Sequence, residues 1–131
     1  MKAQQYNLNF RIIQRESESY PIIECGKDSQ GSSINIELAE FIGTGGVKYT
    51  QEVVADINSL DFTQADSNGL VYEIHSYFNE HLAEFFGSPN RASFWNGTSY
   101  IDIPIQDFLD ILQEWIDFLN SISFEHRLSN R

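Results

Sequence analysis

The chain has 131 residues, with 8 Lys and Arg against 19 Asp and Glu, a formal charge of −11 and 14% aromatic residues. This length suits one domain, and ten Phe, six Tyr and two Trp are too many large apolar side chains for a disordered acidic chain. The charge argues against a nucleic-acid binder, which needs clustered Lys and Arg, and equally against attachment to an anionic membrane surface.

The start of the chain lacks the apolar run of a signal peptide, and no stretch approaches the roughly 18 uninterrupted apolar residues of a membrane span. Cys25 is the only cysteine, so it cannot form an internal disulfide, and a reducing compartment is expected. Without a secretion signal, the glycosylation sequon at Asn96 is better interpreted as a turn. The sequence predicts a cytoplasmic protein.

The first third of the chain predicts strands. Apolar and polar residues alternate over residues 6–12 and 34–38, and residues 20–25 form a further apolar run with Pro21 near its start. The polar segment 26–33 contains glycine and predicts a turn. These connections are too short for helical crossovers, so we expect antiparallel pairing.

The remaining two-thirds predict mainly helices. Residues 50–59 favour a short helix capped by Thr50, and a polar loop follows at 61–69. Over residues 70–86 the apolar positions follow i, i+3, i+4 spacing, with Gly87 and Pro89 as a stop, so we expect a second helix.

The end of the chain gives the clearest helix. Asn96-Gly97 is typical of a turn between two short strands, and Pro104 lies where a helix can begin. The helix is expected to end at about residue 122, before a frayed tail at 124–131. The predicted fold is one α+β domain over residues 1–131, with an N-terminal antiparallel sheet packed against helices from the C-terminal two-thirds.

The charge is concentrated in the later part of the chain. Residues 1–48 sum to −1, residues 49–126 carry thirteen acids and only Arg91 to give −12, and the last five residues add +2. On the two long predicted helices, the acids fall on single faces, at Asp107, Asp110, Glu114 and Asp117 and at Glu73, Glu80 and Glu84. Like charges at these spacings cost a helix roughly 0.2–0.5 kcal/mol per pair.

Two explanations of these acidic faces remain open. Acidic faces are commonly just solvated, but a surface built only for solubility usually mixes both signs of charge. Two aligned faces within the region of −12 favour a basic protein partner. Tyr72, Tyr77 or Trp95 would add contact area to such an interface where they are exposed.

Catalytic and metal-binding patterns are weak. The histidines are His75, His81 and His126; His81 and Glu84 could share a metal, but two ligands do not make a site. Cys25 follows an apolar run, so packing is favoured over a nucleophilic role. Residues 43–48 lack the spacing of a phosphate-binding loop and are better interpreted as a turn. We therefore expect no enzyme, no cofactor and no metal.

The segment from Ile101-Asp102-Ile103-Pro104 through the amphipathic stretch to Trp115 resembles a strand-Pro-helix ending of small bacterial immunity proteins. These are the cognate inhibitors of polymorphic toxins, including those of contact-dependent growth inhibition systems. The resemblance covers about a quarter of the chain. It implies a cytosolic α+β protein that binds one toxin domain and blocks its active site or substrate surface, and many such toxins are basic nucleases.

The predicted function is stoichiometric inhibition of a basic toxin domain, with a nuclease expected, by docking of the acidic faces. No binding residue follows from the resemblance, so the toxin-facing residues rest on charge geometry alone. Two alternatives remain: an acidic interaction module or DNA-mimic regulator without a cognate toxin, and a small enzyme or ligand-binding domain using His75, His81 or Cys25. The sequence leaves the oligomeric state open.

Overall fold

Four helices and six strands make up the part of the chain that the computed structural model describes, which is residues 1–43, 45–75 and 81–129, with side chains up to residue 122. In chain order they are α1 (Lys2–Gln5), β1 (Leu8–Arg15), β2 (Glu18–Cys25), α2 (Ile36–Ile42), α3 (Val47–Asn58), β3 (Leu70–His75), β4 (Leu82–Phe86), β5 (Arg91–Trp95), β6 (Tyr100–Pro104) and α4 (Ile105–Ser129). The predicted α+β class is confirmed.

The strands β1 and β2 form an antiparallel hairpin, in register from Leu8 opposite Cys25 to Arg15 opposite Glu18. Two of the predicted N-terminal strands and their antiparallel pairing are therefore confirmed. The hairpin is tied to α4 by Phe10, whose ring centroid lies 5.0 Å from that of Trp115 and 5.6 Å from that of Phe118.

The third predicted strand, at residues 34–38, is wrong. The segment instead enters α2, where Leu38, Phe41 and Ile42 are buried at helical spacing. Glu, Leu and Ala are good helix formers, and packing of this short apolar face outweighs the alternation of Ile34, Ile36 and Leu38. The N-terminal sheet therefore has only two strands.

The predicted helix at residues 70–86 is also wrong. Its described residues form β3 and β4, which begin a four-stranded antiparallel sheet in the consecutive order β3-β4-β5-β6. Tyr72 and Ile74 point to the same face as Ala83 and Phe85, which are fully buried, so the period of two governs this stretch. The apolar positions fit both periods, and neither Gly nor Pro interrupts the segment in the sequence.

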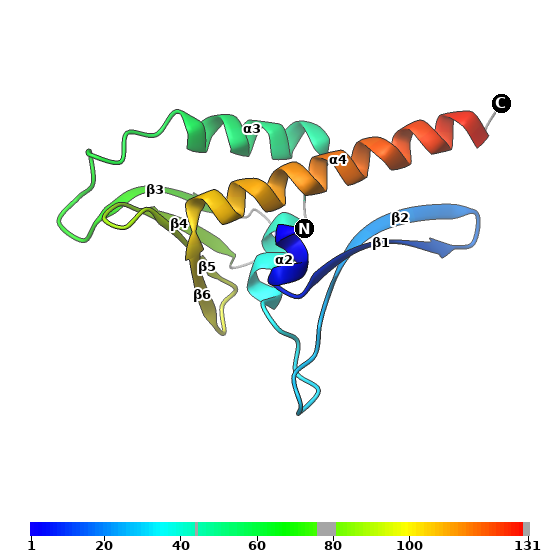
Figure 1. Cartoon of the computed structure of the whole chain (residues 1–131), viewed down its shortest axis with the longest axis horizontal. Coiled ribbons are helices and arrows are strands. Elements are labelled where there is room, and N and C mark those ends of the chain that lie inside the picture. Colours follow the sequence, from blue (N-terminus) through cyan, green and yellow to red (C-terminus); the bar gives the residue numbers. More distant parts are fainter. Residues whose placement is uncertain (44, 76–80, 130–131) are drawn as a thin grey trace.

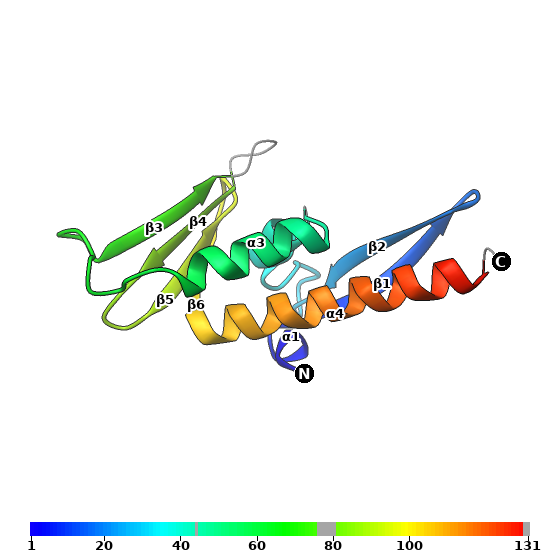
Figure 2. The ribbon, with the colours of Figure 1, turned by 90° about the horizontal axis from the view of Figure 1, so that it is seen from above.

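One face of this sheet, the inner face, packs against α4 and α2. Phe94 on β5 lies 4.7 Å from Phe108 of α4 and 5.4 Å from Phe41 of α2, measured between ring centroids. Figure 1 shows α3 and α4 running side by side above the sheet, and in Figures 1 and 2 the hairpin extends at the opposite end, along the later part of α4. The long helix thus joins two sheets that do not pair with each other.

The predicted turn at Asn96-Gly97 and the predicted helix start after Pro104 are confirmed, whereas the predicted Thr50 cap and the predicted frayed tail are wrong. Asn96 and Gly97 connect β5 to β6, where Gly97 has a φ of +91°, a conformation that favours glycine. Helix α4 begins directly after Pro104 and runs to Ser129, so it includes residues 124–129 of the tail that was expected to fray; residues 130 and 131 lie outside the described part. Helix α3 begins at Val47 and its N-cap is Gly46, so Thr50 does not cap it. Thr50 is buried inside the helix, and its hydroxyl donates to the Gly46 carbonyl at 2.7 Å.

No helix in the described ranges is long and apolar enough to cross a membrane.

Candidate functional site

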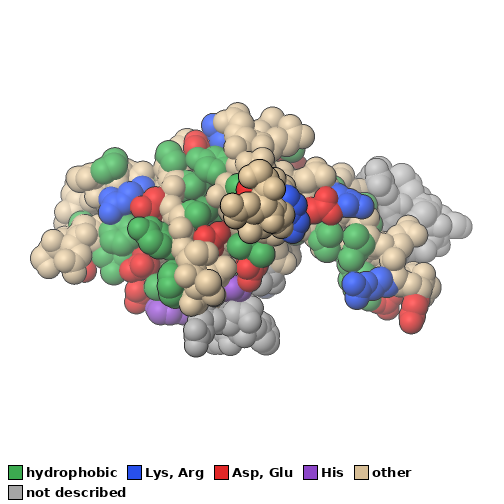
Figure 3. All heavy atoms as spheres, turned by 90° about the horizontal axis from the view of Figure 1, so that it is seen from below, with side chains coloured by type: hydrophobic (Ala, Val, Ile, Leu, Met, Phe, Trp, Pro, Cys, Tyr) green, Lys and Arg blue, Asp and Glu red, His purple; other side chains and the backbone are tan. Residues whose placement is uncertain are grey.

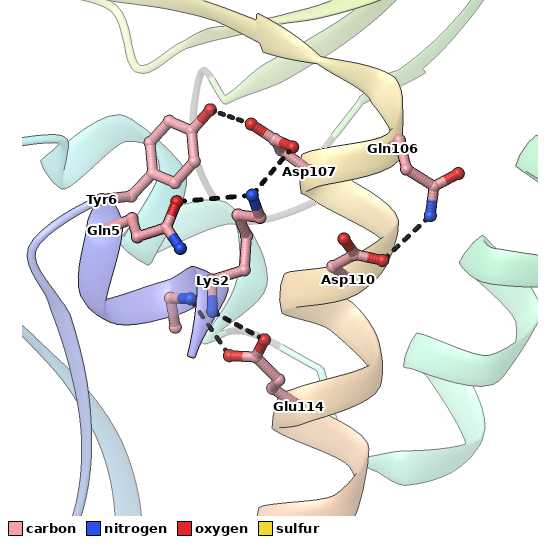
Figure 4. A network of polar contacts seen from close by, with 8 residues as sticks. Lys2, Gln5, Tyr6, Gln106, Asp107, Asp110 and Glu114 are labelled. Carbon is pink, nitrogen blue, oxygen red and sulfur yellow. Dashed lines mark hydrogen bonds and ion pairs between the residues drawn. The ribbon is translucent and has the colours of Figure 1, made fainter.

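Two of the four acids predicted to form a binding face on α4 hold the N-terminal helix instead. The Glu114 carboxylate accepts hydrogen bonds from the backbone N–H groups of Lys2 at 2.9 Å and Ala3 at 3.0 Å. These groups open α1, so Glu114 does the work of an N-terminal cap from another element. Figure 4 shows this carboxylate pointing at the start of α1.

Asp107 has a similar internal role about two helical turns earlier on α4. Its carboxylate accepts from the Tyr6 hydroxyl at 2.5 Å and lies 3.4 Å from the Lys2 ammonium (Figure 4). Burial, together with the hydrogen bond and the negative charge of Asp107, raises the pKa of Tyr6 to about 12. Asp107 and Glu114 are thus half-buried parts of the fold.

Asp110 and Asp117 keep freer carboxylates. Each accepts one hydrogen bond from a glutamine four residues earlier, Gln106 at 2.9 Å and Gln113 at 3.0 Å. Asp117 is exposed and Asp110 is half-buried. Of the four predicted residues on α4, Asp110 and Asp117 are therefore the two whose carboxylates are not engaged with the N-terminal segment.

The second predicted acidic group is Glu73, Glu80 and Glu84, of which Glu73 and Glu84 lie on strands and are still neighbours. Glu73 lies directly opposite Glu84 in the β3–β4 register, so the two carboxylates share the outer face of the sheet, the face opposite α4. They are neighbours across two strands and not along a helix. Glu80 lies outside the described residues.

The register continues this acidic level across the whole sheet. Glu84 lies opposite Ser93, and Ser93 lies opposite Asp102, whose carboxylate accepts a hydrogen bond from the Ser93 hydroxyl. Three of the four strands therefore bring a carboxylate to one level, which we call the acidic row: Glu73, Glu84 and Asp102. Asp102 was missed as a site residue because its neighbours on β3 and β4 were expected in a helix.

Aromatic and basic side chains flank the acidic row. The next level of the register places His75, Leu82, Trp95 and Tyr100 across the four strands, and Trp95 and Tyr100 are 39% and 65% exposed. On the other side, the Arg91 guanidinium lies 4.5 Å from the centre of the Phe86 ring. Figure 3, seen from below, shows acidic, apolar, basic and histidine side chains together over this part of the molecule.

No described side chain of the outer face is buried, whereas the inner face carries the core. Of the aromatic anchors predicted from sequence, Trp95 is on the outer face. Tyr72 packs against Phe85 on the inner face, and Tyr77 lies outside the described residues. Exposure of Trp95 and Tyr100 follows from the alternation of the two strands that the Asn96-Gly97 turn joins.

The histidines and the cysteine are spread over different surroundings. His75 lies 3.2 Å from Glu73, His81 is buried 2.9 Å from Glu40, and Cys25 is half-buried with a pKa raised by burial. The side chain of His126 is outside the described set. Across the described ranges, no three His, Cys, Asp or Glu side chains are grouped closely enough to hold a metal ion, and the pairing of His81 with Glu84 gains no third ligand.

Comparisons with protein-family models, with curated proteins and with solved structures find no match for this chain.

Proposed function

We propose that this chain is an immunity protein, a stoichiometric inhibitor that binds a basic toxin domain of the nuclease class. The observation that supports the proposal best is the outer face of the sheet. There the acidic row and two exposed aromatic side chains lie together, and no described helix covers them.

The acidic row is costly for an isolated sheet. Like charges directly opposite each other on neighbouring strands are destabilising, and Glu73 and Glu84 occupy such a pair. Their only described counter-charges on this face are Arg91, which lies over Phe86, and His75 if protonated. A basic surface would neutralise the row, while Trp95 and Tyr100 would provide the large contact area typical of interface hot spots.

The charge of the whole chain supports the same class of partner. Residues 49–126, which include the sheet and most of α4, sum to −12. A field of this sign steers a basic protein toward the inhibitor and raises the association rate. A nuclease domain is basic because it must hold phosphate, so an acidic surface competes for the same residues.

The proposed interface differs from the one expected from helical faces. Asp107 and Glu114 are engaged with α1, which leaves Asp110 and Asp117 as a smaller outward pair on α4. That pair lies on the helix packed against the inner face, away from the acidic row. The two surfaces can therefore be tested separately.

The direct test is co-purification with the product of the neighbouring gene, followed by a growth-rescue assay in cells that express that product. Wild-type protein should form a one-to-one complex and restore growth. The variant Glu73→Lys/Glu84→Lys should slow association and reduce protection, because it changes the outer face by +4.

The matched variant is Asp110→Lys/Asp117→Lys, which makes the same change of charge on α4. It should bind and protect nearly as well as wild type. If it alone loses binding, the interface lies on α4 and the outer face is refuted. If wild type binds a basic protein yet protects no cell from it, the chain is an acidic interaction module and the immunity role is refuted.

A further inference from the structure

A cavity of about 700 Å³ lies between β2 and α2, and it shares no residue with the outer face of the sheet. Its size is in the range of small-ligand pockets. Ile23, Ile36 and Ala39 give it apolar walls, and Glu40, Lys27 and His81 contribute polar groups. Such a mixture of apolar walls and a few placed polar groups is typical of a binding pocket.

The Glu40 carboxylate is oriented by its neighbours. The imidazole Nε2 of His81 lies 2.9 Å from Glu40 Oε2, and the side-chain amide of Asn96 donates to Oε1 at 3.5 Å. His81 is 6% exposed, whereas the Glu40 side chain is 38% exposed. A buried partner therefore fixes one side of the carboxylate, and its remaining acceptor positions stay open toward the cavity.

His81 has an unused hydrogen-bonding position. Its Nδ1 is buried and has no hydrogen-bond partner within the described part of the chain. Leaving a buried polar atom unpaired costs about 1–3 kcal/mol, so such atoms call for an explanation. His81 lines the cavity, so the cavity wall holds a buried polar atom that no described residue satisfies.

The acids of α2 also lack a fixed cation. Glu37, one helical turn before Glu40, is 7% exposed and accepts from the Ser99 hydroxyl at 2.8 Å. Neither carboxylate forms an ion pair with Lys or Arg among the described residues: the Lys27 ammonium donates to Ser33 at 2.8 Å. The pKa of Cys25 in the same wall is raised by burial, and Glu40 and Glu37 add to this increase while Lys27 opposes it.

We propose that this cavity binds a guanidinium-bearing ligand, with Glu40 receiving the planar cation, His81 positioning Glu40, and Ile23 and Ile36 covering the ligand's apolar stem. A guanidinium offers five N–H donors in a fork that matches a carboxylate, and it is more weakly hydrated than an ammonium. It therefore suits a half-buried carboxylate beside apolar walls.

Two probes test the proposal on the intact chain and separate the sources of the cation. Agmatine represents a free small molecule, and N-acetyl-arginine amide represents an arginine side chain within a polypeptide. Titration followed by ¹⁵N-HSQC spectra should shift the amides of residues 22–25 and 36–40. Binding of agmatine alone indicates a small-molecule ligand, and binding of the blocked arginine alone indicates an arginine of another protein.

Variants of opposite sign sharpen the result. Glu40→Gln keeps a hydrogen-bond acceptor for His81 and should weaken binding by about tenfold or more, while Glu52→Gln on the exposed side of α3 should have no effect. Lys27→Gln removes from the cavity wall a positive charge that repels the guanidinium, so it should tighten binding. Lys48→Gln, at an exposed position, is its control.

A readout on wild-type protein avoids dependence on variant folding. Cys25 lines the cavity, so saturating agmatine or blocked arginine should slow its alkylation by iodoacetamide. The proposal is overturned if neither probe shifts the cavity amides or slows alkylation, or if Glu40→Gln binds as tightly as wild type.

Discussion

The carboxylate of Glu114 stabilises the fold and is not part of a free charged surface. Its carboxylate satisfies two N–H groups that open α1 and would otherwise face only water or nothing. Because α1 has only four residues, it has little stability of its own. The attachment of the N-terminal segment to α4 therefore depends strongly on this one side chain.

The variant Glu114→Ala should lower the free energy of unfolding by about 1–3 kcal/mol, because two backbone donors lose a charged acceptor. Urea unfolding followed by circular dichroism measures the change. Asp117→Ala, on the same helix but at an exposed position whose one hydrogen bond within the described residues is to Gln113, should change stability by less than about 0.5 kcal/mol. Equal effects of the two substitutions would contradict the capping role.

Ionisation of Tyr6 should lower the stability of the fold at alkaline pH. Its pKa is raised from 10.0 to about 12 by burial and by Asp107, so the neutral phenol is favoured in the folded state. The resulting stability is fully present below pH 10 and is lost as the pH rises from 10 to 12.

Wild-type protein should therefore lose more thermal stability between pH 10 and 12 than Tyr6→Phe, whose phenyl ring cannot ionise. Melting temperatures at half-unit pH intervals measure the difference. Tyr20 also has a raised pKa, through its hydrogen bond to Glu18, but it is present in both proteins and cancels. Parallel curves for the two proteins over this range would show that Tyr6 is not responsible.

At the scale of elements, the β1–β2 hairpin is the least supported sheet. A two-stranded hairpin is marginal by itself, and this one relies on Phe10 packing against Trp115 and Phe118 of α4. The four-stranded sheet has its own buried aromatic contacts with α4 and α2. The two ends of the molecule should therefore differ in local stability.

Phe10→Ala should destabilise the protein by about 2–3 kcal/mol, less than a fully buried Phe, since Phe10 is half-buried. Its main effect should be local: hydrogen exchange should accelerate at the amides of β1 and β2 and stay nearly unchanged in β4 and β5. Uniform acceleration across both sheets would mean that the hairpin and the larger sheet unfold as one unit.

The elements that sequence predicted correctly carry one unambiguous period or a strong stop signal. The alternation of residues 6–12, the Asn96-Gly97 turn and the proline before α4 each have one favourable interpretation. Residues 70–86 have two favourable interpretations. Their apolar positions fit one helix as well as two strands, and no Gly or Pro separates the two halves of the segment. Pairing of β4 with β5 decides between the two, and the apolar pattern of residues 70–86 alone does not show that partner.

For the candidate site, the sequence predicted the acidic character of the surface but not the arrangement of its residues. Acid-rich residues 49–126 gave the sign of the surface, and Glu73 and Glu84 do lie together, though across strands. Helical spacing could not show that α1 would occupy Asp107 and Glu114, because those bonds join residues more than a hundred positions apart. Asp102 joins the acidic row only through the register of β6.

At the scale of the whole molecule, the net charge of −11 leads to a kinetic prediction for the proposed complex. The association rate with a basic partner should fall steeply as NaCl increases from 50 to 500 mM, because salt screens the steering field, while the dissociation rate changes little. Stopped-flow mixing at several salt concentrations measures both rates. A salt-independent association rate would contradict electrostatic steering by this surface.

The consecutive order of β3 to β6 also has a consequence for how the chain folds. Every strand of this sheet pairs with its neighbour in the sequence, so the sheet can form with little loss of chain entropy. The bonds from Glu114 to α1 close a loop that spans 112 positions. The sheet and the start of α4 should therefore assemble early, and the amino-terminal helix should dock last, onto a surface that is already complete.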